Sequence, residues 1–473
     1  MKILLINAPR EGEVAEFASP NFLSNDFFHM PPLGLLAIAA EVNPLHDLKV
    51  FDPITKNMSI QDVVRYVSDF KPDLLGISVV SRRLYPAITF LCQVKAVLPD
   101  MITVAGGPHI NDFPMETMQL GSVDYAMTGF CEKSFPMLVE TLSEDRSRRP
   151  GIENIPGLHY FADGAIQSNP VPSRPIILDD LPFPKRELLD VKDYFSMADQ
   201  GQMTTILTSR GCPYKCTFCD VQEKDYYYRS TESIVDEFED ILSLGISEIV
   251  IFDDTFNMGR KRVIDMCKEI LHRGLKVKWS ARVRAHPMDR EMLKIMKKAG
   301  CIRLHCGIES IHPKSLKNMK KKITLAHIKD FFSMCNEFNI DTLAYFILGF
   351  PEEDENYRKN FINEIKKLKP TFIEVCVLFP LAQTPMYREL LENGTYKKDY
   401  WYEFFKNPVK DWELPPFREP SLQEELQNIV VTSYKKFYLS PRFIMKDLQR
   451  NTTFDNFTRK IKLATGLFFA DFK

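Results

Sequence analysis

The sequence predicts an α/β protein. We expect an N-terminal doubly wound, Rossmann-like parallel sheet, then a partial (β/α)6 barrel and a mostly helical C-terminal segment. Strand-like and helix-like patterns alternate over the first 145 or so residues, a second alternating series starts near residue 204, and the strand signal stops near residue 395. The 473 residues are 45% hydrophobic and 26% charged, which is typical of globular proteins and excludes global disorder.

The first series consists of short apolar runs separated by amphipathic or Leu- and Ala-rich stretches. We predict strands at 3–7, 48–52, 74–80, 102–105 and 124–128, and helices at 32–42, 60–70, 86–98 and 134–142. In a doubly wound sheet of this kind, ligands bind beyond the carboxyl ends of the strands.

The alternation breaks over residues 146–200, where prolines are frequent between 170 and 184. We expect this stretch to be a linker that wraps around the molecule rather than packing. The predicted domains are therefore 1–145 (sheet domain), 146–200 (linker), 201–395 (barrel) and 396–473 (helical cap).

The second series contains six strand–helix units. We predict strands at 204–208, 248–253, 276–283, 302–309, 342–348 and 372–379, and helices at 233–244, 260–273, 290–299, 325–338 and 355–368. Right-handed crossovers curl six such units into a barrel that stays open on one side.

Charge and targeting signals narrow the function classes. The formal net charge of −2 provides no overall basic field, so no nucleic-acid partner is expected. No run of 18 apolar residues predicts a membrane span, and the apolar start before Pro9 and Arg10 is too short for a signal peptide. We expect a cytoplasmic protein whose ten cysteines are thiols or ligands.

Three cysteines, Cys212, Cys216 and Cys219, lie within eight residues directly after the first strand of the second series. One short loop can bring three thiolates to one metal centre, and an iron–sulfur cluster with three cysteine ligands keeps one iron open. A structural zinc site is the alternative, but no second ligand pair follows. The other cysteines are expected to be core residues: Cys92, Cys131, Cys267, Cys301, Cys306, Cys335 and Cys376.

This C-x3-C-x2-C loop resembles the signature of the radical SAM superfamily. The resemblance implies a 4Fe–4S cluster on the three cysteines and S-adenosylmethionine (SAM) bound to the open iron, with reductive cleavage to a 5′-deoxyadenosyl radical. Phe218 matches the aromatic residue near the adenine, and Glu309 and Ser310 lie where the family has polar SAM contacts. Gly349 begins a turn that resembles the family's glycine turn after the fifth strand.

The N-terminal domain carries small or polar residues at its predicted strand ends. The positions are Pro32, Gly34, Ser78, Gly106, Gly107, His109, Gly129 and Glu132. Their order resembles the cobalamin-binding domain of one branch of the superfamily, which implies that they line a cobalamin site. No G-x-G-x-x-G fingerprint follows the first strand. The D-x-H-x-x-G motif is also absent, which excludes a lower axial histidine from that motif, and His109 is a cofactor contact or a core residue.

The resemblance implies a cobalamin-dependent radical SAM methyltransferase that methylates an unactivated carbon through methylcobalamin and the 5′-deoxyadenosyl radical. An external one-electron reductant of the flavodoxin or ferredoxin type would be required. A cyclase or rearrangement enzyme on the same scaffold is one alternative, and a non-catalytic cobalamin and iron–sulfur sensor is another. Asp253 and Asp254 end the second barrel strand, and we expect one to be catalytic and the other to cap the next helix.

Two further stretches are basic. The lysine run at 320–322 is expected to be a solvated loop. Residues 434–473 interleave basic and Phe side chains, which fits a cap packed on the barrel, a peripheral contact with an anionic membrane or, less well, nucleic-acid stacking. The substrate class stays open between a small molecule, a lipid and a peptide.

Overall fold

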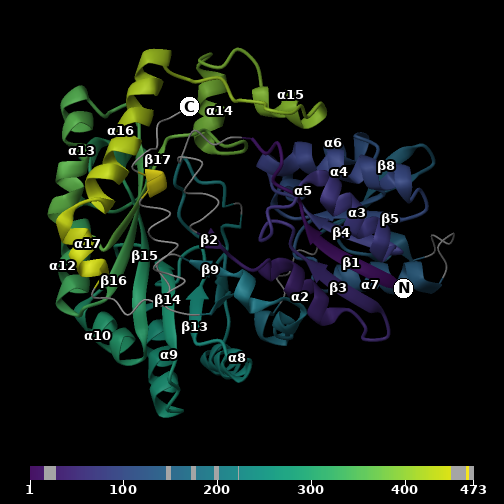
Figure 1. Cartoon of the computed structure of the whole chain (residues 1–473), viewed down its shortest axis with the longest axis horizontal. Helices are drawn as coiled ribbons and strands as arrows, with labels where there is room; N and C mark the ends of the chain where they lie inside the picture. Colours follow the sequence, from purple (N-terminus) through teal and green to yellow (C-terminus); the bar gives the residue numbers. More distant parts are fainter. Residues whose placement is uncertain are drawn as a thin grey trace. The chain divides into compact units, whose positions relative to one another are not determined.

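The computed structural model describes residues 1–14, 28–144, 151–171, 177–196, 202–221, 223–448 and 465–467. Contacts divide the chain into two compact units (Figure 1). Unit 1 consists of Met1–Ala15, Pro32–Asp193 and Tyr396–Pro415, and unit 2 consists of Glu16–Pro31, Tyr194–Thr395 and Pro416–Lys473. Residues 396–415 thus group with unit 1, whereas the predicted domain borders assign them to the C-terminal cap. Those borders stay a prediction.

Unit 1 is built on a seven-stranded sheet with the order β3-β1-β4-β5-β6-β7-β8. Its strands are β1 (Lys2–Asn7), β3 (Asp47–Phe51), β4 (Leu74–Ser78), β5 (Ile102–Gly106), β6 (Tyr125–Met127), β7 (Leu158–Ala162) and β8 (Ala165–Ser168). The first five are parallel, as predicted. Their central strands are almost wholly apolar because helices cover both faces of a parallel sheet.

Unit 1 has four helices at the predicted positions and two short ones, at Pro108–Asp112 and Pro114–Gln119, that were not predicted. The helices are α2 (Leu33–Glu41), α3 (Ile60–Phe70), α4 (Leu84–Val97), α5 (Pro108–Asp112), α6 (Pro114–Gln119), α7 (Ser134–Glu144) and, from the third chain segment, α15 (Tyr400–Lys406). Helix α3 shows why the sequence folds this way: Ser59 and Asp62 form a capping box, and Val63 and Val67 are buried on its apolar side.

The expected linker is wrong for residues 158–168. Strands β7 and β8 form a hairpin that extends the sheet in antiparallel pairing with β6. Ile152, Ile155 and Leu158 are buried in the same apolar core as helices α2 and α7. The hairpin covers the edge of β6, which would otherwise leave unpaired backbone groups.

Unit 2 contains a six-stranded parallel sheet with the order β10-β13-β14-β15-β16-β17, which confirms the predicted partial barrel. Its strands are β10 (Met203–Ile206), β13 (Glu248–Ile251), β14 (Lys278–Val283), β15 (Cys301–Glu309), β16 (Asp341–Leu348) and β17 (Phe372–Val377). Two short pairs lie outside it: β2 (Phe28–His29) with β9 (Phe195–Ser196), and β11 (Ser209–Arg210) with β12 (Tyr227–Tyr228).

Helices cover the outer face of this sheet (Figure 1). They are α8 (Thr231–Ser243), α9 (Arg260–His272), α10 (Arg290–Lys298), α12 (Leu325–Glu337) and α13 (Glu355–Leu368), and the short helix α11 (Pro313–Asn318) follows the end of β15. Side-chain N-caps at Ser230, Asp289, Thr324 and Asp354 fix where four of them begin.

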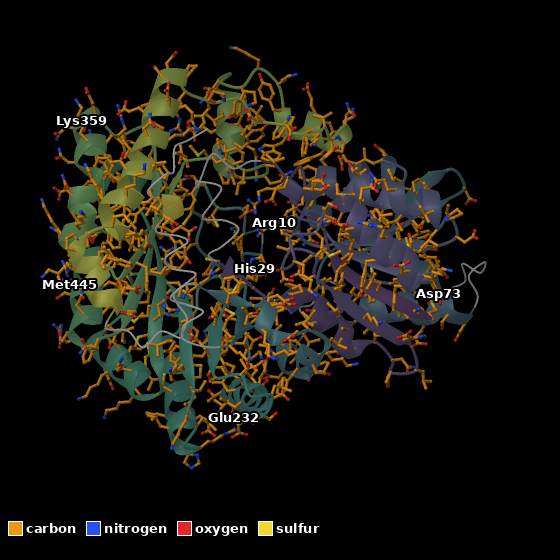
Figure 2. All side chains as sticks on the ribbon, in the orientation of Figure 1. Arg10, His29, Asp73, Glu232, Lys359 and Met445 are labelled. Atoms are coloured by element: carbon orange, nitrogen blue, oxygen red, sulfur yellow. The ribbon has the colours of Figure 1, made fainter. Side chains whose placement is uncertain are left out.

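The chain beyond β17 is helical where it is described: α14 (Pro385–Glu392), α15, α16 (Pro420–Tyr438) and α17 (Pro441–Leu448). Tyr434 and Tyr438 on α16 donate hydrogen bonds to backbone oxygens of β17, and the Phe443 ring packs on Tyr438. Met445 on α17 points outward, 61% exposed (Figure 2). These contacts agree with a cap that packs on the barrel. In the basic and aromatic segment 434–473, residues 449–464 and 468–473 lie outside the described residues.

Candidate active site

The cysteine loop follows β10 and β11 at the carboxyl end of the unit 2 sheet, where (β/α) barrels place their active sites. Backbone hydrogen bonds anchor it at two points: the Cys212 amide donates to the Glu223 carbonyl at 2.9 Å, and the Thr217 amide donates to the Met319 carbonyl at 3.1 Å. Gly211 has a φ of +83°, and a Cβ there would collide with the Asp225 carbonyl. These contacts fix the backbone of the loop.

The three thiols differ in burial. Cys212 and Cys216 are buried and Cys219 is half-buried. Burial, reinforced by Asp220 and Cys216, raises the pKa of the Cys219 thiol to about 11. A thiol of this kind becomes a thiolate when a metal ion coordinates it.

In the described part of the chain, no three His, Cys, Asp or Glu side chains converge closely enough to hold a single metal ion. A cubane cluster does not need such convergence, because each cysteine ligates a different iron. Three thiols on one anchored loop, with no carboxylate or imidazole added to the set, are the donors that an iron–sulfur cluster takes. Cys212, Cys216 and Cys219 therefore fit an iron–sulfur cluster.

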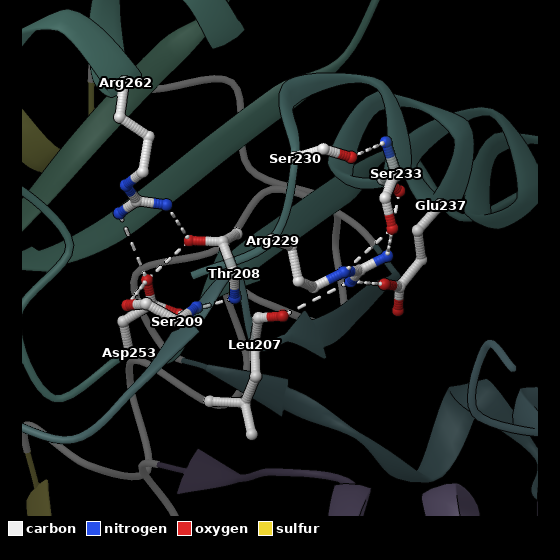
Figure 3. A network of polar contacts seen from close by, with 9 residues as sticks. All are labelled: Leu207, Thr208, Ser209, Arg229, Ser230, Ser233, Glu237, Asp253 and Arg262. Carbon is white, nitrogen blue, oxygen red and sulfur yellow. Dashed lines mark hydrogen bonds and ion pairs between the residues drawn. The ribbon is translucent and has the colours of Figure 1, made fainter. Parts of the chain in front are cut away.

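Asp253 anchors the chain that leads into this loop (Figure 3). Its carboxylate, which is 0% exposed, accepts hydrogen bonds from the amide and hydroxyl of Thr208 (2.7 and 2.5 Å) and of Ser209 (3.1 and 2.6 Å). Arg262 lies 3.6 Å from the same carboxylate and donates to the Thr208 hydroxyl at 2.8 Å. The end of β13 is thereby tied to the segment just before Cys212.

A second buried ion pair contacts the chain directly after strand β10. The Arg229 guanidinium contacts the Glu237 carboxylate on α8 and donates to the Leu207 carbonyl at 3.3 Å (Figure 3). It also donates to the Ser233 carbonyl at 2.8 Å, which fixes the first turn of α8.

The expected helix-capping role of Asp253 or Asp254 is wrong. Helix α9, the next helix, begins after Gly259, and no side chain caps it. Asp254 reaches solvent, but surrounding protein atoms still raise the pKa of its carboxyl by desolvation, and Asp253 adds to this. A catalytic role for either residue stays a prediction, and only Asp254 has a carboxylate that is open to a ligand.

The ends of β15 and β16 carry the predicted SAM contacts. Glu309 forms a buried ion pair with Lys321, at 2.6 Å between Oε1 and Nζ, and this Nζ lies 5.7 Å from the centre of the Phe218 ring. The Phe218 and Phe350 ring centres are 6.2 Å apart. The structure thus brings Phe218 and Glu309 together, with Gly349 next to Phe350.

The expectation of a solvated lysine loop is wrong for Lys321, which is 6% exposed. Its partner Glu309 has a φ of +64° where the register between β15 and β16 shifts, so its side chain is directed to a position that a regular strand would not give. The neighbouring lysines, Lys320 and Lys322, complete the run of three positive charges that predicts a solvated loop.

Glu353 is a site residue that the sequence interpretation missed. It accepts hydrogen bonds from the Gly349 amide at 2.7 Å, the Phe350 amide at 3.2 Å and the Ser310 hydroxyl at 3.0 Å. Burial raises the pKa of Glu353 to about 7 despite these donors. The available signal was a glutamate four residues after Gly349, where a carboxylate can close the glycine turn.

In unit 1, several predicted residues meet at the carboxyl ends of neighbouring strands. Ser78 and Gly106 are paired in register at the ends of β4 and β5. Gly107 follows with a φ of +100°, and Gly129 follows β6 with its amide donating to Asn111 at 2.8 Å. A Cβ at Gly106 would meet only the Met127 carbonyl oxygen, at 3.9 Å. Of these glycines, Gly106 has open space where a side chain would lie, which leaves room for a flat ligand at the end of β5.

Apart from His109, the remaining unit 1 positions are Pro32, Gly34 and Glu132. Pro32 precedes α2, and a Cβ on Gly34 would meet no atom within 4 Å. Glu132 is 6% exposed.

His109 is enclosed rather than presented at the sheet end. Its exposed fraction is 0%, its Nδ1 lies 3.0 Å from the Ser81 hydroxyl, and the rings of Phe113 and Phe405 pack on it. Burial lowers the pKa of His109 to about 3, so the imidazole is neutral. This geometry is that of a core histidine, and a cofactor contact through His109 stays a prediction.

Comparison with known proteins matches a family model to each of the two units. The model of the Radical SAM superfamily matches residues 206–365, and the model of the B12 binding domain matches residues 24–139. An uncharacterized methyltransferase of Pyrococcus horikoshii is 30% identical over 456 residues, 95% of each chain. The chain is a radical SAM enzyme with a B12-binding domain.

Two further proteins resemble this radical SAM enzyme. The anaerobic magnesium-protoporphyrin IX monomethyl ester cyclase of Rubrivivax gelatinosus is 25% identical over 95% of this chain and 80% of its own length. The solved structure of TsrM, a radical S-adenosylmethionine methyltransferase from Kitasatospora setae, has a TM-score of 0.65 at 20% identity, covering 83% of this chain and 76% of that one. The latter shows a common fold.

Membership of this family identifies the cofactors as a 4Fe–4S cluster, SAM and cobalamin. The chain depends on a reductant, as radical SAM enzymes do. Within the described residues, no helix is both long and apolar enough to span a bilayer.

Proposed function

We propose that this radical SAM enzyme is a methyltransferase that methylates an unactivated carbon of a small-molecule substrate. The observation that carries the proposal is the anchored three-cysteine loop at the carboxyl end of the unit 2 sheet, in a chain whose other unit matches a B12 binding domain. The similarity to a methyltransferase along 95% of both chains supports the same reaction class.

The bound groups would supply two kinds of chemistry, a substrate radical from the cluster with SAM and a transferable methyl group from cobalamin. The chain's own residues would position them: Cys212, Cys216 and Cys219 hold the cluster, and Phe218 and the Glu309–Lys321 pair flank SAM. In unit 1, Ser78, Gly106, Gly107 and Gly129 would line the corrin.

The proposal includes an external one-electron reductant of the flavodoxin or ferredoxin type. A lipid or peptide substrate is compatible with it, and so is a peripheral membrane contact through the exposed Ile444 and Met445 beside Lys446 on α17. Vesicle flotation with and without anionic lipid tests that contact, and a protein that stays at the bottom of both gradients contradicts it.

A cyclase is the second candidate, because the magnesium-protoporphyrin ester cyclase aligns with 95% of this chain. SAM carrying a trideuterated methyl group separates the two functions. The protein is loaded anaerobically with iron, sulfide and hydroxocobalamin and is then reduced. It is given the labelled SAM together with cell extracts, which supply candidate substrates.

A methyltransferase forms S-adenosylhomocysteine together with 5′-deoxyadenosine and transfers the label to a product. A cyclase forms 5′-deoxyadenosine without transferring the label. A protein that binds both cofactors but never cleaves SAM is a sensor, and that result would overturn the proposal.

A further inference from the structure

The inner face of the unit 2 sheet is lined by polar side chains. Pairing in register places Arg282 beside His305, and Tyr345 beside Glu374, while Cys306 on the opposite face lies near Cys335 of helix α12. The first four therefore point away from the covering helices, toward the barrel interior. Branched aliphatic side chains ordinarily fill that interior. Charged and aromatic groups here require another explanation.

Arg282 is a cation without a counterion in contact. The centre of its guanidinium group lies 3.3 Å from the centre of the Phe252 ring, and no hydrogen bond or ion pair reaches it from the described residues. Asp254 and Glu374 act on it electrostatically from a distance, and burial lowers the pKa of the guanidinium. Arginine stays charged in proteins, so its hydrogen-bond donors remain available to an acceptor.

His305 adds a second unused group on the same face. The residue is 4% exposed, and its Nδ1 lies 3.2 Å from the Tyr345 hydroxyl. Its Nε2 is enclosed and has no partner among the residues that the structure describes. Burial, with Arg303 and Arg282 nearby, lowers the pKa of His305, so the ring is neutral. When Tyr345 donates to Nδ1, Nε2 carries the hydrogen and is a donor.

Ser280 lies two residues before Arg282 on the same face of β14. It is fully buried, and its hydroxyl also has no partner in the described part of the chain. Buried polar groups are normally hydrogen-bonded, because an unpaired one has lost its hydrogen bonds to water without a replacement. Unused groups on Arg282, His305 and Ser280, all on one face, indicate a polar ligand.

We propose that this face binds a carboxylate group, with Arg282 as the ion-pair partner and His305 as a hydrogen-bond donor that Tyr345 orients. The inference rests on the proposed function, because the carboxylate belongs to the substrate that is methylated. A cationic ligand fits less well, since Arg282 already occupies the aromatic face of Phe252 that would attract one. The planar guanidinium matches a carboxylate in a bidentate pair.

Butyrate and its uncharged analogue butyramide are the probes. Saturation-transfer NMR on the full chain, loaded with cluster and cobalamin in a buffer without carboxylates, measures both dissociation constants. We expect butyrate to bind and Arg282→Gln to weaken it by at least about tenfold, because a hydrogen-bonded charge pair is lost. Tyr345→Phe should weaken it by a smaller factor, about twofold to fivefold, because His305 loses its orienting partner.

The matched control is Arg290→Gln, which removes an exposed arginine of the same unit paired with Glu337 at 2.8 Å. This variant should bind butyrate as the wild type does. Iron and cobalamin contents of each variant report its folding. Equal binding of butyramide and butyrate, or unchanged butyrate binding by a correctly loaded Arg282→Gln protein, would overturn the inference.

Titration in saturating SAM identifies the source of the carboxylate. Butyrate that still binds marks a substrate site, and butyrate that SAM displaces would overturn the inference. A wild type that binds butyrate through Arg282 but never transfers a labelled methyl group would keep this inference and remove the proposed function.

Discussion

Glu353 accepts a hydrogen bond from the Ser310 hydroxyl at 3.0 Å and thereby joins the chain after β16 to the chain after β15. The same carboxylate closes the glycine turn through the amides of Gly349 and Phe350. The two segments predicted to contact SAM are therefore held by one buried acid, which lies outside the set of residues that the sequence singled out.

The stability of the protein should depend on pH through Glu353. Burial raises the pKa of Glu353 to about 7, so between its ordinary value and about pH 7 the folded chain binds more protons than the unfolded chain. The stabilising contribution is complete at low pH and is lost as the pH rises through about 7, by about 2–3 kcal/mol. Urea denaturation at pH 5 and pH 8 should show a smaller difference in Glu353→Gln than in the wild type. Equal differences would show that Glu353 does not titrate in this range.

Cluster binding is tested by Cys216→Ala. We expect iron to be lost and SAM cleavage to be abolished, while cobalamin binding persists because unit 1 binds it. Cys335→Ala is the control, since this buried thiol lies on α12, far along the chain from the loop. Iron retained by Cys216→Ala, or lost equally from Cys335→Ala, would contradict the assignment of the cluster ligands.

The two neighbouring aspartates should behave differently. Asp253→Asn places an amide NH2 against the donors of Thr208 and Ser209 and leaves Arg262 without its buried partner, which should cost about 3–5 kcal/mol of stability. Asp254→Asn should leave stability within about 0.5 kcal/mol because its side chain reaches solvent. Denaturation midpoints decide this, and an iron-loaded Asp254→Asn protein that makes no product would place the catalytic role on Asp254.

Substitutions at two adjacent glycines of unit 1, Gly106 and Gly107, should distinguish an effect on folding from an effect on cobalamin binding. Gly107→Ala introduces a Cβ 2.9 Å from the Ser78 hydroxyl and the Val79 backbone at a φ of +100°, which should destabilise unit 1 by about 1–3 kcal/mol. Gly106→Ala meets no close atom, so it should fold normally and bind cobalamin more weakly if this glycine faces the corrin. Cobalamin retention after desalting measures the second effect. Wild-type retention by a folded Gly106→Ala protein would remove Gly106 from the site.

Hydrophobic periodicity was sufficient to predict much of the fold. Helices α3 and α13 begin and end at the predicted residues, because each has an apolar side and a side-chain cap. The hairpin β7–β8 was not predictable in this way: its exposed strand β8 carries little apolar pattern, and its pairing depends on the edge of β6.

The site residues also differ in whether a local sequence pattern predicts them. The spacing of three cysteines is local and visible in the sequence, whereas the burial of Lys321 depends on Glu309 and the enclosure of His109 depends on Phe405, almost three hundred residues away. The inner-face cluster around Arg282 requires knowledge of which strand faces which, and no short motif records that.

Each unit is assembled from three separate stretches of the chain, and residues 396–415 return to unit 1 after the barrel is complete. No single cut yields two self-sufficient fragments. Exchange of cobalamin modules between relatives, whether by recombination in a genome or by construction of chimeras, therefore has to carry this late segment along with the N-terminal part. A fragment that ends at residue 395 lacks the Phe405 ring that covers His109, and an isolated cobalamin module should be designed with that segment joined to it.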